Sequence, residues 1–259
     1  NYRFQHPTQF NISMEETTRL LIDKRLEVFQ EGQMLLFDKP LNWTSFDVVN
    51  RVRIALCRYF DVRKLKVGHA GTLDPLATGL LIICTGKFTK RIDDIQAQEK
   101  IYTGTIRIGE TTPTYDLESE PDTTYPIDHI NEEMIEIVRK QFLGPIMQQP
   151  PIFSAIKKDG KRSYDLARKG IDAKLEPRAI TINSLIFDTS SFPDLGFEVN
   201  CSKGTYIRSL AYDIGLALGS GAYLKSLHRA GIGSYSNDDA WVLQDFLDEF
   251  KISQMPKDL

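Results

Sequence analysis

The chain has 259 residues, of which 41% are hydrophobic, with 32 basic and 35 acidic side chains and a formal net charge of −3. A chain of this length can bury a large core without disulfides or metals, and its mildly acidic total is not typical of a nucleic-acid-binding protein. It contains no apolar run as long as a membrane-spanning helix and no basic-then-apolar leader. Its three cysteines are widely spaced, which favours a reducing compartment and argues against a structural zinc site. We therefore expect a cytoplasmic protein.

Charge is unevenly distributed along the chain. Residues 108–139 hold nine acidic residues and one basic residue, whereas residues 155–178 hold eight basic and four acidic residues. Such asymmetry fits a protein that meets a polyanion with one face and water with another. Ordinary surface charge explains the same counts, so the pattern alone leaves both interpretations open.

The first half of the chain predicts an N-terminal extension, a strand, a helix and a second strand. Residues 1–30 form the extension, which includes one helix, and residues 33–37 form a strand. Ser45 is a good N-cap for a helix over 46–59, because the apolar residues of that segment fall on one face. The apolar run 80–84 has the length of a buried strand.

The second half mixes strands and helices without a regular β-α-β alternation, which favours an α+β fold. The pattern predicts a strand over 102–108, an acidic loop over 111–128, a helix over 131–142, strands over 180–188 and 196–201, a helix over 209–218, a helical turn over 223–229 and a helix over 241–250.

The stretch from Val67 to Gly79 presents one carboxylate, Asp74, on a stiff loop. Pro75 biases Asp74 toward extended conformations, and the glycines of this stretch permit sharp turns or close approach of another segment. A single acid held in this way is a candidate nucleophile. A capping or turn aspartate is the equal alternative.

Two later positions could serve Asp74. Arg208 is a candidate counter-ion, because a nearby guanidinium favours the ionised carboxylate. Tyr206 would face the same way as Arg208 on an extended stretch, where its ring could stack on a base or move a proton. A core tyrosine is the plainer interpretation. His69 could equally be a hydrogen-bonded loop histidine, and the four scattered histidines give no metal-binding set.

A basic turn carries four cations, Lys157, Lys158, Lys161 and Arg162. Together with the aromatic residues of the same turn, they predict contacts with a phosphate backbone. A solvated turn is the alternative.

Taken together, these segments resemble the TruB-like tRNA pseudouridine-55 synthases, of the bacterial type that lacks a C-terminal RNA-binding PUA domain. The likeness runs from Lys39 to Arg229, and its most specific parts are the aspartate box at 68–79 and the Lys-Gly-Thr-Tyr-Ile-Arg box at 203–208. Other matching residues are Pro40, Thr44, Ser45, Lys100, Tyr102, Thr114, Asp116, Pro151–Lys157, Gly160, Tyr164, Pro177, Arg178 and Leu227.

The resemblance implies the pseudouridine synthase catalytic fold, a mixed and mainly antiparallel sheet flanked by helices, with a thumb-like insertion. The catalytic domain would span 31–250, with the insertion at about 152–178. The N-terminal extension of residues 1–30 would precede it, and a C-terminal tail at 251–259 would follow it.

The resemblance also implies an isomerase that converts uridine to pseudouridine at position 55 in the T loop of tRNA, without a cofactor or metal. Asp74 would be the catalytic aspartate, which releases the uracil from its N1–C1′ bond before the base rejoins through C5. The partner would be the T arm of tRNA, bound by a monomer with no membrane involved.

Five further positions receive roles from the same resemblance. Arg208 would pair with Asp74, while Tyr206 would lie against the uracil and take the C5 proton. Tyr102 would stack on the other side of the pocket, and Leu227 would close the site. His69 would contact nucleotides around the target base, which must be flipped out of a folded loop.

The chain also departs from the family pattern. Asn42 stands where the family usually has glycine, and Tyr223 and His228 replace a common histidine and arginine near Leu227. After Phe250 only nine residues follow, so contacts beyond the T arm would be weaker or supplied differently.

Two other classes of function compete with the isomerase. A tRNA-folding chaperone would bind the T arm without chemistry. A retaining glycosidase would need a second carboxylate about 5 Å from Asp74, and the matching boxes offer no obvious one.

Overall fold

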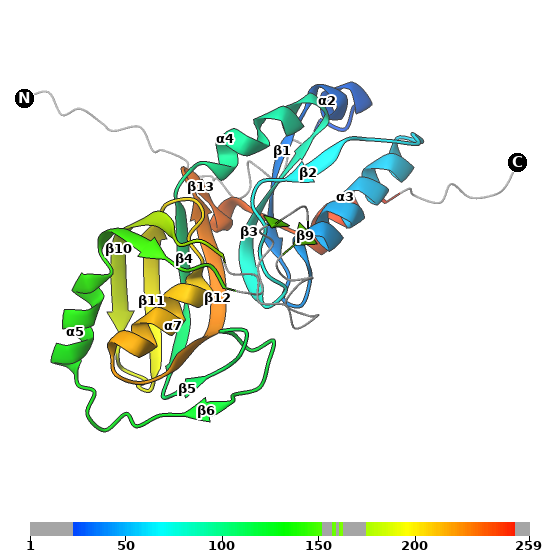
Figure 1. The fold of residues 1–259 in the computed structure, drawn as a ribbon. Helices are drawn as coiled ribbons and strands as arrows, with labels where there is room; N and C mark the ends of the chain where they lie inside the picture. The colour runs from blue at the N-terminus through cyan, green and yellow to red at the C-terminus, as the bar shows by residue number, and fades with distance from the viewer. Residues whose placement is uncertain (1–22, 152–156, 159–160, 163–174, 252–259) are drawn as a thin grey trace, which may run out of the picture.

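The computed structural model describes residues 23–151, 157–158, 161–162 and 175–251 (Figure 1). The helix predicted in the N-terminal extension lies partly outside the described residues, and its end corresponds to a helix at Leu26–Glu31. Most of the predicted insertion also lies outside the described residues. None of the described helices combines the length and apolar character that crossing a membrane requires.

A ten-stranded sheet organises the molecule. Its strands are β1 (Met34–Lys39), β2 (Val67–His69), β3 (Ala77–Thr85), β4 (Lys100–Ile108), β7 (Gly144–Gln148), β10 (Arg178–Asp188), β11 (Asp194–Cys201), β12 (Ala222–Ile232), β13 (Tyr235–Ser236) and β14 (Trp241–Val242). The order is β14-β1-β3-β12-β4-β11-β10-β7, with β2 beside β3 and β13 beside β12. Only the β1–β14 and β12–β3 pairs within this sheet are parallel. The predicted α+β class with a mainly antiparallel sheet is confirmed.

The helices cover the sheet in two groups. They are α2 (Leu26–Glu31), α3 (Ser45–Tyr59), α4 (Ile92–Gln96), α5 (Glu132–Gln141), α7 (Ile207–Ala217) and α8 (Leu243–Glu249), with the 3₁₀ turns η1 (Gly86–Arg91) and η2 (Asn237–Asp239). Two short hairpins complete the described chain, β5 (Glu110–Thr111) with β6 (Thr123–Thr124) and β8 (Lys157–Lys158) with β9 (Lys161–Arg162). In Figure 1, α5 and α7 lie against the half of the sheet that contains β10, β11 and β12, and α3 lies beside β3.

Each half of the sheet has its own core. One core packs α5 and α7 against β4, β10, β11 and β12, with Ile106, Leu195 and Ile214 each 0–1% exposed. The other packs α3 and α8 against β1 and β3, around Phe37 and Leu81. Burying each large apolar side chain contributes about 1.5–3 kcal/mol relative to leaving it exposed. The strands between the two cores are therefore held firmly, and strands β4 and β12 supply Tyr102, Leu227 and Arg229 to the site described below.

Helix α3 begins with a capping box one residue earlier than predicted. The Thr44 hydroxyl accepts a hydrogen bond from the Asp47 amide at 3.0 Å, and the Asp47 carboxylate accepts one from the Thr44 amide at 2.9 Å. Ser45, the predicted cap, turns inward instead, since its hydroxyl accepts from the Leu73 amide at 2.9 Å and donates to the Leu73 carbonyl at 3.2 Å. The start of α3 is thus fastened to the residue that precedes Asp74.

Two elements differ from the prediction. Residues 223–229, predicted as a helical turn, belong to β12, which is hydrogen-bonded along both edges to β3 and β4. The backbone hydrogen bonds of β12 to strands on both sides outweigh the helix-like pattern of apolar residues at 223–229. The proline-containing segment after α5, for which no strand was predicted, contains β7, and its Pro145 is tolerated because β7 is an edge strand paired with β10 alone.

The turn at Asn42 keeps a glycine-like backbone although glycine is absent. Asn42 has φ 66°, in the left-handed region that asparagine tolerates better than other residues with a Cβ. Its amide donates to the Pro75 carbonyl at 2.9 Å, next to Asp74. The departure from the family pattern therefore preserves the turn.

We expect Asn42→Ala to lower the free energy of unfolding by about 1–2 kcal/mol, because alanine is strained at positive φ. Asn42→Gly relieves this strain and should change the same quantity by less than about 1 kcal/mol. Urea denaturation measures both variants. Equal losses in both would show that the asparagine side chain, and not the backbone conformation, is what the turn requires.

Candidate active site

The loop that carries Asp74 lies between β2 and β3 and is held through its backbone. The Ala77 amide donates to the Asp74 carbonyl at 3.0 Å, closing a turn around Pro75. The Pro75 carbonyl accepts from the Asn42 amide and, at 3.2 Å, from the Lys39 ammonium. The Asp74 side chain remains 40% exposed. The loop thus presents a half-exposed carboxylate from a fixed backbone.

Lys39 is a buried cation that serves this loop. Its side chain is fully buried, and its ammonium also donates to the carbonyls of Pro40 at 2.9 Å and Trp43 at 2.6 Å. Burial lowers the pKa of Lys39 to about 8, while the negative charge of Asp74 acts in the opposite direction. The sequence analysis singled out Lys39 only through the family resemblance. Its contact with the Pro75 carbonyl is seen only in the folded structure.

The predicted pairing of Asp74 with Arg208 is present. Arg208 Nε lies 3.0 Å from Asp74 Oδ2, and the Arg208 side chain is only 7% exposed. Arg208 is the second residue of α7, so the start of this helix places the guanidinium beside Asp74. The ion pair leaves the arginine buried and the carboxylate on the open side.

A second carboxylate, Asp116, binds the same arginine. Its Oδ2 lies 3.6 Å from Arg208 Nε, its Oδ1 accepts from the Glu118 amide at 3.0 Å, and the residue is 4% exposed. The Thr114 carbonyl also accepts from Arg208 Nη1 at 3.4 Å. Asp116 was among the residues that match the family, but it was not predicted as a site residue. One of its oxygens accepts a hydrogen bond, the other forms an ion pair with Arg208, and the residue is buried, so it is not placed as the acid of a glycosidase.

Tyr102 and Arg229 form the neighbouring part of the site. Tyr102 is buried on β4 opposite Arg229 on β12, and burial raises the pKa of its phenol, an effect that the Arg229 guanidinium opposes. Arg229 is 1% exposed and donates from Nε to the Leu80 carbonyl at 2.7 Å and from Nη2 to the Gly71 carbonyl at 3.0 Å. Arg229 therefore joins β12 to the first part of the aspartate loop and to the strand β3 that follows the loop. The candidate site residues did not include it.

The remaining predicted residues lie at three different places. His69 ends β2, and burial lowers the pKa of its imidazole, with the positive charge of Arg229 acting in the same direction. Leu227 lies on β12 between Ala77 of β3 and Gly104 of β4.

Tyr206 is the N-cap of α7, with an extended backbone at φ −99° and ψ 108°. Because Arg208 is already helical, the expectation that the two side chains face the same way along one extended stretch is wrong.

The basic turn is described only through its backbone. The strands β8 and β9 pair Lys157 with Arg162 and Lys158 with Lys161. The side chains of these four residues lie outside the described part of the chain, so their predicted phosphate contacts stay a prediction.

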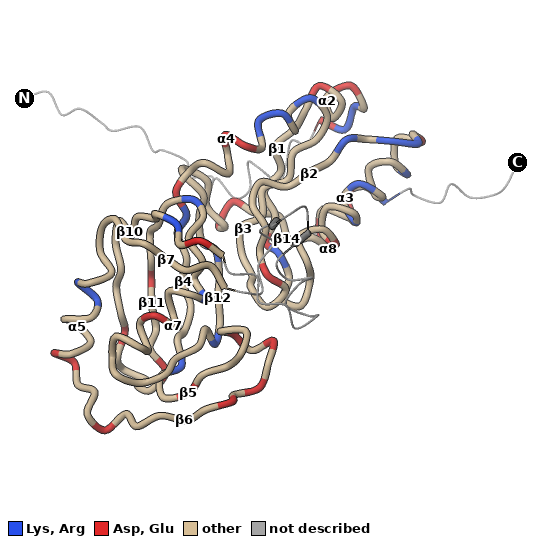
Figure 2. Tube along the Cα trace, in the orientation of Figure 1, with Lys and Arg blue, Asp and Glu red and all other residues tan. Residues whose placement is uncertain are grey.

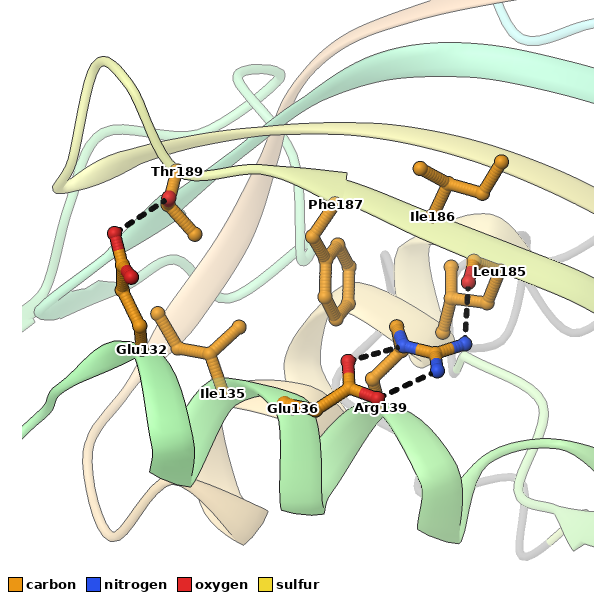
Figure 3. Close-up of a pocket in the computed structure, with 8 residues that line it drawn as sticks. All are labelled: Glu132, Ile135, Glu136, Arg139, Leu185, Ile186, Phe187 and Thr189. Carbon is orange, nitrogen blue, oxygen red and sulfur yellow. Dashed lines mark hydrogen bonds and ion pairs between the residues drawn. The ribbon is translucent and has the colours of Figure 1, made fainter.

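A separate pocket lies between α5 and β10 (Figure 3). There Arg139 binds Glu136 through two nitrogens, at 2.6 and 2.7 Å, and donates to the Leu185 carbonyl at 2.9 Å. The residues lining this pocket include none of the predicted site residues. Across the described ranges, no three histidine, cysteine or acidic side chains gather as a metal site would require.

Comparison with known families places two matches end to end. The N-terminal domain of the TruB family pseudouridylate synthases matches residues 58–207, and the C-terminal domain of tRNA pseudouridylate synthase B matches residues 208–258.

Known relatives match over most of the chain. A tRNA pseudouridine synthase B of Phocaeicola vulgatus is 51% identical over 88% of this chain and 98% of its own. One from Flavobacterium johnsoniae is 56% identical over 83% of this chain and 94% of its own.

Two solved structures contain chains with a similar fold. A Cbf5–Nop10–Gar1 complex contains a chain with a TM-score of 0.64 and 28% identity, aligned over 85% of this chain and 54% of that chain. An H/ACA ribonucleoprotein bound to a substrate RNA gives a TM-score of 0.62 at 25% identity, over 86% of this chain and 55% of that one. This chain thus spans about half the length of those solved chains. From the matched domains and these relatives, the chain belongs to the TruB family of pseudouridine synthases, enzymes that isomerise uridine to pseudouridine in tRNA.

Proposed function

We propose that this chain forms pseudouridine at position 55 in the T loop of tRNA, with Asp74 as the group that attacks the target nucleotide. The observation that carries the proposal is the pair of a half-exposed Asp74 carboxylate and a buried Arg208 guanidinium, 3.0 Å apart. A carboxylate that is fixed by its loop and paired with a guanidinium beside an open face is suited to act as a nucleophile. Its relatives are named tRNA pseudouridine synthase B.

The proposed reaction exchanges one bond to C1′ for another. Asp74 attacks C1′, or an equivalent position, as the N1–C1′ bond breaks and its electron pair stays on N1 of the uracil. The base then rotates, and C5 forms the new bond to the sugar while the bond to Asp74 breaks. Loss of the C5 proton and protonation of N1 complete an isomerisation in which no atom is gained or lost.

The two tyrosines take different roles in this proposal. Burial raises the pKa of Tyr102, so its phenol stays neutral and offers a ring surface for the base. Tyr206 is only partly buried, lies two residues before Arg208, and is the candidate acceptor of the C5 proton. Leu227 packs at the rim of the same core and would close over the uracil.

RNA recognition completes the proposal. The target uridine must leave its stacked position, which costs a few kcal/mol, and contacts to the surrounding nucleotides must compensate. We assign these contacts to His69 and to the basic turn with Lys157, Lys158, Lys161 and Arg162, acting in a cytoplasmic monomer. The turn would belong to a thumb-like insertion at about 152–178 within a catalytic domain of residues 31–250.

We expect Asp74→Asn to abolish pseudouridine formation, because an amide is a poor nucleophile and a poor partner for Arg208. Binding of tRNA should stay within about threefold of the wild type, since the substitution removes one charge and no bulk. Mass spectrometry of tRNA together with filter binding measures both quantities. Asp128→Asn, at an exposed aspartate, is the matched control. Isomerisation by Asp74→Asn at the wild-type rate would refute the catalytic role, and normal binding without isomerisation in the wild type would favour the folding chaperone.

Arg208→Lys should lower the rate constant of isomerisation by about 10²–10³-fold, the usual cost of removing a positioned charged donor. A lysine ammonium cannot reproduce the planar fork that here reaches Asp74, Asp116 and the Thr114 carbonyl. Single-turnover kinetics with excess enzyme gives the rate constant. Arg139→Lys breaks a comparable two-nitrogen ion pair in the pocket of Figure 3 and should leave the rate constant unchanged. Similar losses in both variants would point to general destabilisation.

Neutralising Lys158 and Lys161 to glutamine should weaken tRNA binding and flatten the dependence of log K on log salt by about two units, one for each lost phosphate contact. Lys24→Gln with Lys87→Gln is the matched control, because each of these lysines already pairs with a glutamate of the chain. Binding titrations at several salt concentrations give the slopes. An unchanged slope would make the basic turn ordinary solvated surface.

A further inference from the structure

Gln148, the last residue of β7, is a buried amide with both of its polar atoms committed to one residue. It is 2% exposed. Its Oε1 accepts a hydrogen bond from the Tyr206 amide at 2.8 Å, and its Nε2 donates to the Tyr206 carbonyl at 3.0 Å. The side chain thus bridges the N–H and C=O of a residue 58 positions later in the chain.

This contact is made where the backbone changes from extended to helical. Tyr206 is the N-cap of α7, and its own side chain makes no capping hydrogen bond. Gln149, the residue after β7, adds a third hydrogen bond, because its carbonyl accepts from the Ser209 hydroxyl at 2.7 Å. The first turn of α7 is therefore fastened to the end of β7 on both sides of Arg208.

Any buried glutamine needs hydrogen-bond partners. The presence of these two bonds therefore does not by itself indicate a functional role. What distinguishes Gln148 is that its two bonds fix φ and ψ of a single residue, and with them the direction of the Tyr206 Cα–Cβ bond. The same bonds set where α7 starts, and hence where Arg208, two residues on, meets Asp74. A misplacement of about 1 Å at such a point can cost about 10²-fold in rate.

We infer that Gln148 is a positioning residue for the isomerisation, holding Tyr206 and Arg208 in register with Asp74. This inference rests on the roles proposed above for those three residues. It assigns to β7, an edge strand paired with β10 alone, the task of setting the geometry at the reacting base. Gln148 would act through Tyr206, to which both of its side-chain polar atoms are hydrogen-bonded.

Two substitutions separate positioning from simple stability. Gln148→Met keeps the length of the side chain and removes both hydrogen bonds. We expect its single-turnover rate constant to fall by about 10²-fold, with the dissociation constant of tRNA unchanged within about twofold. Asn131→Ala removes the N-cap of α5, whose Oδ1 accepts from the Met134 amide, and so is a stability control away from Asp74. It should lower thermal stability and leave the rate constant unchanged.

Gln148→Glu adds a readout that a purely structural role would not give. A neutral carboxylic acid accepts and donates as the amide does, whereas a carboxylate would place an oxygen against the Tyr206 carbonyl. Burial favours the neutral form. The rate constant of this variant relative to the wild type should therefore rise as the pH is lowered from about 8 to about 6.

The results decide between positioning and stability. A Gln148→Met rate constant within about twofold of the wild type would overturn the inference. If that variant does not fold, the pH series of Gln148→Glu decides alone, and a relative rate constant that does not change with pH overturns it. Pseudouridine is measured in total tRNA and its position is mapped separately. Formation outside the T loop would refute the proposed target without affecting the test of Gln148, and an active Asp74→Asn would refute the proposed nucleophile.

Discussion

The buried guanidinium of Arg208 is the group on which the geometry of the site depends. A charge that is 93% removed from water is costly unless it is paired and hydrogen-bonded. Here its partners come from two distant parts of the chain, Asp74 on the loop before β3 and Asp116 on the loop after β5. Removing either acid would leave the arginine with too little compensation. The aspartate loop, the segment around Asp116 and helix α7 are therefore ordered together.

Other buried cations hold the backbone of the aspartate loop and leave the Asp74 carboxylate to pair with Arg208. Lys39 is fully buried and Arg229 is 1% exposed. Both donate hydrogen bonds to main-chain carbonyls of the aspartate loop. Among the described residues neither cation forms an ion pair with Asp74, whose charged partner is Arg208. The loop is fixed from its backbone, and the side chain stays half exposed for the substrate.

Much of the fold follows from local patterns, but the packing around the site does not. The strands β4, β10 and β11 and the helices α3 and α5 were predictable because alternation or 3.6-residue periodicity marks them clearly. Strand β12 was misread because its central place in the sheet depends on partners more than a hundred residues away. The pairing of Asp74 with Arg208 came from the resemblance, since no spacing rule joins residues so far apart. The parts played by Asp116, Gln148 and Arg229 are likewise long-range contacts and left no local signal.

The acidic segment 108–139 shows how one stretch of sequence can carry two different uses of charge. Figure 2 shows acidic residues along the loop that carries β5 and β6. Glu118, Glu120, Asp122 and Asp128 are exposed there, whereas Asp116 is buried against Arg208. The exposed acids repel RNA phosphates and disfavour approach of a tRNA over this loop. The buried acid holds the arginine that pairs with Asp74. The acids of this segment thus differ in their surroundings, because four are exposed to solvent and one is paired with Arg208 inside the site.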